Sequence, residues 1–166
     1  IGGDKAAVKA AFNYLMVGTI AATFILIGIG YIYAASGTLN MDDFIHRFDT
    51  FKDVRATRVG IVLMLGGLMV KAGLFPLHNW MVYIYKTTNS FFLTFTGSVS
   101  AKVYALVIIK LIYFVFTPDL VLHIIGLKKV ILLCGLLAIS IGAITAFYQE
   151  DLRSFLAFSS VSQIGY

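Results

Sequence analysis

Long apolar runs separated by short charged segments make up most of this chain. No charged residue lies between Lys9 and Asp42, and residues 10–35 alone form an apolar run of 26 residues. A run of that length can span a hydrocarbon core of about 30 Å with some tilt. Further apolar runs cover residues 59–85, 91–116 and 130–148, and a last one begins at Ser154. The pattern predicts a polytopic all-α helical bundle of about four full transmembrane helices plus the start of a fifth.

Residues 40–56, between the first two runs, have a different pattern. Asn40 can cap a helix, and apolar residues then recur at helical spacing at Met41, Phe44, Ile45, Phe48 and Phe51. Charged residues take the other face. This segment is predicted to be an amphipathic helix lying on the membrane surface, and a solvated linker is the alternative.

Composition supports the membrane class. Apolar residues make up 60% of the chain and charged residues 13%, and the mean hydropathy is +0.92, which exceeds what a soluble domain shows. The net charge of +5 comes from cations that flank apolar runs or lie within them, so a lipid bilayer is expected as a partner and nucleic acid is not. Cys134, the single cysteine, is expected to be a small buried apolar residue. No metal-ligand spacing and no haem, iron–sulfur or nucleotide motif is found, so no cofactor is expected.

The two ends of the sequence suggest that it is an excerpt. It begins at Ile1 without an initiator methionine and ends at Tyr166 while an apolar segment is still running. Residues 1–166 are therefore expected to form a single membrane domain from a longer protein.

Two lysines lie near the middle of apolar runs that contain no acidic residue. Lys71 lies in the run 59–85 and Lys102 in the run 91–116. A lysine at the centre of a membrane helix costs about 2.5–3.5 kcal/mol, and such residues usually handle ions, protons or charged ligands. Snorkelling to the interface is the alternative, and it explains Lys110, near the end of its run, more readily than the other two.

Pro76 follows Lys71 by five residues and should interrupt the second helix, because proline lacks an N–H and its ring clashes with the preceding turn. A freed carbonyl inside a bilayer must be buried in protein or face water, so the break predicts a polar interior on that side. His78, just beyond the break, could shuttle protons. As a lone histidine near Trp80, it could equally be an interfacial anchor.

Polar residues form stripes on the later segments. Thr94, Ser98 and Lys102 are spaced four residues apart on one helix face, where hydroxyls could order water near the amine. On the last segment a polar face that no lipid would favour is expected to point into protein; it contains Ser159, Ser162, Gln163 and Tyr166. The charges of the preceding turn are interpreted as ordinary loop charges; they belong to Glu150, Asp151 and Arg153.

Three segments carry a family resemblance: VKAGLFPLHNW at residues 70–80, SAKVYAL around Lys102, and YQEDLRSFLAFSSVSQIGY at 148–166. They resemble the proton-translocating, antiporter-like membrane subunits of respiratory complex I (NADH:quinone oxidoreductase) and the large subunits of Mrp-type cation/proton antiporters. The resemblance implies that the chain covers the family's helices six to nine and the start of ten. Lys71 would then match the central lysine of the broken seventh helix, which faces a glutamate on helix five. Lys102 would match the position on helix eight that relays protons to the second half of the subunit.

The function implied by this resemblance is translocation of protons or sodium ions by a subunit that is not itself catalytic. It would work with other membrane subunits, which hold the redox chemistry, in a bacterial or archaeal cell membrane or the mitochondrial inner membrane. The family usually has prolines and a histidine between Met81 and Phe92, whereas this chain reads MVYIYKTTNSFF. This departure motivates the alternative of an accessory or degenerate structural subunit that does not conduct. A self-contained channel or solute carrier is a third interpretation.

Overall fold

The structure, a computed structural model, describes residues 2–89, 91, 99 and 101–166. The described residues are mostly helical and contain no strand, as predicted. The α-helices are α1 (Gly2–Ser36), α2 (Met41–Phe51), α3 (Arg55–Ala72), α4 (Asn79–Thr87), α6 (Ala101–Lys110), α7 (Leu127–Phe147) and α8 (Leu152–Gly165). Two short π-helices, η2 (Leu111–Val115) and η3 (Asp119–Ile124), lie between α6 and α7.

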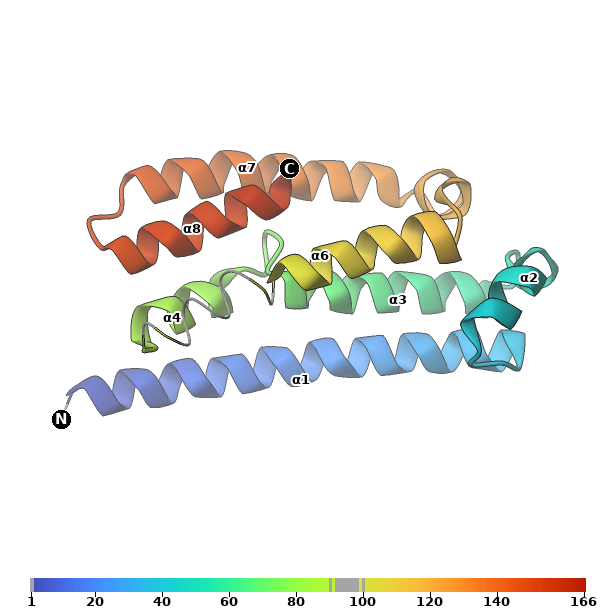
Figure 1. Ribbon diagram of the computed structural model, residues 1–166, viewed down its shortest axis with the longest axis horizontal. Coiled ribbons are helices and arrows are strands. Elements are labelled where there is room, and N and C mark those ends of the chain that lie inside the picture. The colour runs from blue at the N-terminus through green and yellow to red at the C-terminus, as the bar shows by residue number, and fades with distance from the viewer. Residues whose placement is uncertain (1, 90, 92–98, 100) are drawn as a thin grey trace.

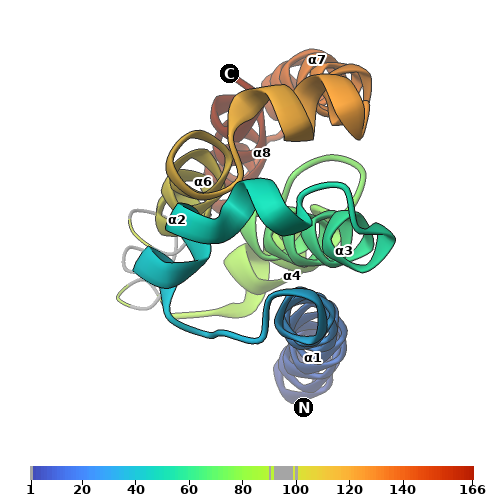
Figure 2. The same cartoon turned by 90° about the vertical axis from the view of Figure 1, so that its right-hand side faces the viewer.

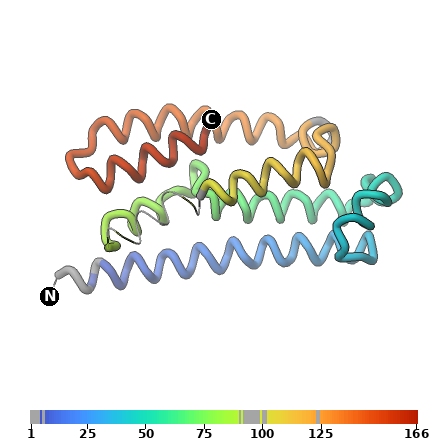
Figure 3. The backbone as a smooth tube through the Cα atoms, viewed as in Figure 1, coloured from blue at the N-terminus to red at the C-terminus, as the bar shows by residue number. Residues whose placement is uncertain are grey.

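The long helices lie roughly parallel or antiparallel to one another in an elongated bundle (Figures 1 and 3). α1 packs along α3, and α7 packs along α8. α4 contacts both α1 and α8, and α6 packs on α3, so these shorter helices join the two pairs.

Two stretches of described helix are long and apolar enough to cross a membrane. They are Ala7–Ser36, with 30 residues, and Leu127–Phe147, with 21 residues. The run 59–85 forms two shorter helices, α3 and α4, because it is interrupted. The first part of the run 91–116 falls largely outside the described residues.

Glycines allow α1 and α3 to approach each other closely. A Cβ atom added to Gly28 of α1 would lie 2.7 Å from the carbonyl oxygen of Gly60, and one added to Gly67 of α3 would lie 2.6 Å from that of Ala21. The α7–α8 pair has the same property, since a Cβ on Gly142 would lie 2.9 Å from the backbone nitrogen of Ser162. Such contacts are typical of membrane helices, whose association depends on close packing rather than on the hydrophobic effect.

The α1–α3 contact gives a stability prediction. Gly28→Ala should destabilise the protein by about 1–3 kcal/mol, because the backbone of α3 must move away from the new methyl group. Gly30→Ala is the matched control, because a Cβ at Gly30 meets nothing within 4 Å. Thermal unfolding of the full-length protein in detergent measures both variants. Equal unfolding temperatures would show that the two helices are not held in this contact.

α2 folds back onto one end of the bundle (Figure 2). Phe44, Phe48 and Phe51 are buried, and the Phe44 ring centroid lies 4.9 Å from that of Phe51 and 6.0 Å from that of Phe116. These rings pack against Phe116, so the phenylalanine side of α2 is covered by the bundle. Contact with the membrane surface stays a prediction for the exposed Met41 and Ile45.

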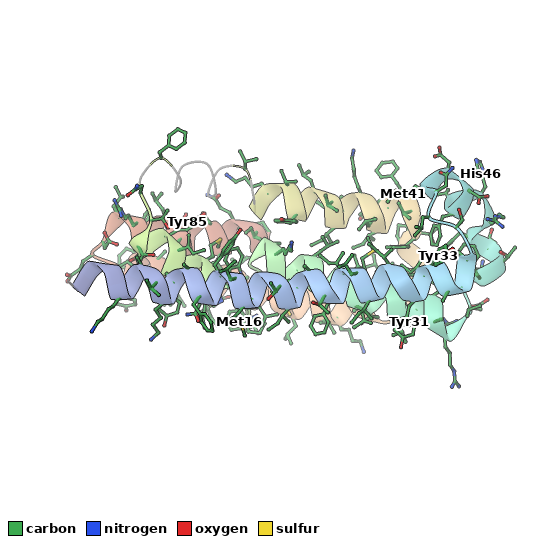
Figure 4. The ribbon with its side chains drawn as sticks, turned by 90° about the horizontal axis from the view of Figure 1, so that it is seen from below. Met16, Tyr31, Tyr33, Met41, His46 and Tyr85 are labelled. Atoms are coloured by element: carbon green, nitrogen blue, oxygen red, sulfur yellow. The ribbon has the colours of Figure 1, made fainter. Side chains whose placement is uncertain are left out.

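The polar face of α2 carries ion pairs. Arg47 pairs with Asp43, and this hydrogen bond lowers the pKa of the Asp43 carboxyl. Lys52 pairs with Asp49 at 2.7 Å. At the start of the helix, the Asn40 side chain accepts a hydrogen bond of 3.1 Å from the backbone N–H of Asp42, as its predicted capping role requires. His46 lies on this helix, at the end of the bundle opposite Tyr85 (Figure 4).

Candidate functional site around Lys71

Lys71 lies in the last turn of α3 and is half-buried. Its Nζ atom lies over the ring of Tyr104 on α6, 5.6 Å from the ring centroid. The ion pairs found among the described residues involve α2, the segment that follows it and the first turn of α3, and none includes Lys71. Within this part of the chain, the amine therefore faces an aromatic ring and has no carboxylate partner.

The helix that carries Lys71 ends directly after it, and the predicted break is observed. α3 ends at Ala72, Gly73 takes the left-handed conformation with φ 76°, and α4 begins at Asn79, so Pro76 lies within the interruption. The carbonyl of Val70, next to Lys71, accepts hydrogen bonds of 3.1 Å from the Gly73 N–H and from the Trp80 indole N–H. The Met69 carbonyl accepts one of 3.1 Å from Leu74.

These bonds satisfy two carbonyls in the last turn of α3. The carbonyl that Pro76 leaves without its helical donor is that of Ala72, so a polar interior beside the break stays a prediction. The carbonyls of Met69 and Val70 do not need water, because backbone N–H groups and one indole satisfy them. The Trp80 indole on α4 thus bonds across the break to the end of α3. The ring centroids of Trp80 and of Tyr14 on α1 lie 5.8 Å apart.

Trp80→Phe tests this bond across the break, because it keeps an aromatic ring near Tyr14 and removes the indole N–H. The lost hydrogen bond should lower the free energy of unfolding by about 0.5–1.5 kcal/mol. Thermal unfolding of the full-length protein measures the effect, with Tyr83→Phe, an exposed position on α4, as the control. Unchanged stability would mean that the indole bond contributes nothing.

His78 is buried, with 7% of its surface exposed. Its ring stacks on Phe75 with centroids 5.4 Å apart and meets the edge of Phe158 of α8 at 6.1 Å. Its Nδ1 atom has no hydrogen-bond partner among the described residues. This burial between protein rings argues against an interfacial anchor, and a role in proton transfer stays a prediction.

Lys102 and Lys110 lie on the exposed side of α6, whereas Tyr104 turns toward α3. Residues 102 and 104 are about 200° apart around a helix, so the structure brings Tyr104 rather than Lys102 to Lys71. Thr94 and Ser98 lie outside the described residues, and their stripe with Lys102 stays a prediction.

On α8 the expected polar face divides. Ser162 is buried against α7, and its hydroxyl lies 3.4 Å from the carbonyl oxygen of Ile139. The contact of this stripe with protein stays a prediction, and within the described residues Gln163 and Tyr166 are exposed. The reason is geometric, because successive helical residues point about 100° apart and the α7 contact covers only one of them.

The charged turn before α8 is structural, as interpreted from the sequence. Asp151 caps α8 by accepting bonds of 3.2 Å from the Ser154 N–H and 3.0 Å from its hydroxyl, and these bonds lower the pKa of Asp151. Arg153 donates a bond of 2.9 Å to the Thr88 carbonyl at the end of α4. Sequence reasoning missed this link and the Tyr104 contact, because both join segments distant in the chain.

Comparison with known proteins places this geometry in a family context. The family described as "NADH:quinone oxidoreductase/Mrp antiporter, TM" matches residues 1–166. NADH-quinone oxidoreductase subunit N of Desulforudis audaxviator is 36% identical, in a match that covers 99% of this chain and 32% of that protein.

Two solved structures have the same fold. A chain of the archaeal membrane-bound sulfane sulfur reductase superposes with a TM-score of 0.83 at 27% identity, over 97% of this chain and 32% of that one. A chain of the Mrp complex from Dietzia gives a TM-score of 0.79 at 30% identity, over 96% and 28%. The chain thus spans about a third of the length of the proteins it matches.

Proposed function

This chain belongs to the NADH:quinone oxidoreductase/Mrp antiporter transmembrane family, and we propose that it translocates protons or sodium ions as an antiporter-like subunit of a complex I-type or Mrp-type assembly. It is an integral membrane protein, as its family and its apolar helices indicate. The observation that carries the proposal is the position of Lys71: a half-buried amine in the last turn of a helix that breaks in mid-run, without a carboxylate partner among the described residues.

The chemistry follows from this position. An amine in apolar surroundings pays a desolvation cost for its charge, and a nearby anion offsets that cost. A carboxylate that approaches Lys71 and then withdraws would therefore drive proton uptake and release. In the proposed subunit this partner is a glutamate on another helix, and Lys102 accepts the proton that Lys71 releases. The pathway also includes His78, Thr94 and Ser98. Lys110 and Gln163 are weaker candidates for it.

The proposal also fixes how the chain sits in the bilayer. We propose four full transmembrane spans and the start of a fifth. α1 and α7 are the unbroken spans, α3 with α4 forms the broken one, α6 belongs to the remaining one, and α8 begins the fifth. Other membrane subunits cover the exposed faces, and any redox chemistry resides in other subunits.

A structural subunit that does not conduct is the second candidate, and the MVYIYKTTNSFF segment favours it because the family's usual prolines and histidine are missing there. Cation flux in vesicles that hold the assembled complex separates the two. Loss of flux on Lys71→Met, with normal assembly, supports conduction. Unchanged flux supports the structural role.

A further inference from the structure

Tyr104 and Lys71 come from different helices, and their contact is built into the packing of α6 on α3. Tyr104 is half-buried and packs against the apolar cluster that contains Leu111 and Phe116. The ring is therefore held by its neighbours, and its face is presented to the Lys71 amine at 5.6 Å.

The face of an aromatic ring attracts a cation within about 6 Å of its centroid, through the ring quadrupole. The same face offers no comparable attraction to a neutral amine. The contact therefore discriminates between the charged and neutral states of Lys71, and it does so in the last turn of α3, beside the break.

We propose that Tyr104 is a positioning residue that holds the charged Lys71 amine at the α3–α6 interface between ion-transfer steps. This inference rests on the proposed function. It also gives α6 two roles, because the ring faces Lys71 while the Lys102 amine lies on the exposed side of the same helix.

A fluorination series tests the ring without changing its shape. Phenylalanine and its mono-, di- and trifluorinated forms are introduced at position 104 of the full-length chain in its complex. Each fluorine withdraws charge from the ring face and weakens cation binding. Cation transport should be close to wild type with phenylalanine and fall stepwise with fluorine number, by about 2- to 30-fold over the series. Tyr104→Leu should be as slow as the trifluorinated form.

The same series at Tyr113 is the control, because that residue is 60% exposed and lies in η2, the short helix after α6. No dependence on fluorine is expected there. A flat series at position 104, in a complex whose transport is lost on Lys71→Met, would overturn the role of Tyr104 and leave the proposed function standing. Normal transport by the Lys71→Met complex would instead overturn the proposed function and this inference with it.

Discussion

Replacing Lys71 with Met is expected to reduce cation transport about a hundredfold or more while the complex still assembles. Met keeps the apolar stem and removes only the titratable amine, and a positioned proton-transfer group typically contributes about 10²- to 10⁴-fold. Folding should not suffer, because taking a cation out of a membrane helix removes an energetic cost. Proton and sodium fluxes into vesicles containing the complex measure the effect and identify the ion.

Two further substitutions sharpen this result. Lys71→Arg keeps the positive charge but cannot release its proton, so it should fail nearly as badly. Lys86→Met removes an exposed lysine at the end of α4 and should transport normally. An assembled Lys71→Met complex with a normal rate would end the proposed role.

Lys102→Ala should also slow transport strongly, because Lys102 is proposed to pass on what Lys71 releases. If the two lysines serve one path, the double variant with Lys71→Met is no worse than the slower single variant. Lys128→Ala is the matched control, because Lys128 is exposed at the start of α7 and outside the proposed pathway, so transport should be normal.

Two results would contradict a single path through both lysines. Losses that add for Lys71 and Lys102 would indicate two separate routes. A Lys102→Ala complex that transports normally would leave Lys71 as the central group contributed by this chain.

Much of the local structure could be predicted from the sequence. The charge-free run before Asp42 becomes α1, and Pro76 lies in an interruption between two helices. These features depend on run length and on one residue's covalent structure, which are local properties. The position of Lys71 in an apolar run indicated a functional role, and the family motifs pointed to the same residue.

Which surface meets which neighbour could not be predicted from the sequence. The spacing of the α2 phenylalanines predicts one apolar face, and the structure shows that Phe116 packs against it. Ser162 and Gln163 were expected on one polar face, and α7 covers Ser162 while Gln163 is exposed in the described part of the chain. Helical spacing says that residues share a face, and only tertiary packing decides what that face touches. Tyr104 was missed for the same reason.

The titratable amine at position 71 is the centre of this account, and chemical restoration tests it most directly. Lys71→Cys is prepared in a complex whose other cysteines, Cys134 among them, are replaced by Ala, and position 71 is then labelled in the assembled complex. An aminoethyl thiol reagent rebuilds a side chain of nearly the length of lysine, and a methyl thiol reagent is the control. We predict that transport lost in the cysteine variant returns only with the aminoethyl label. Full labelling without recovery, or equal recovery with the methyl label, would contradict the account.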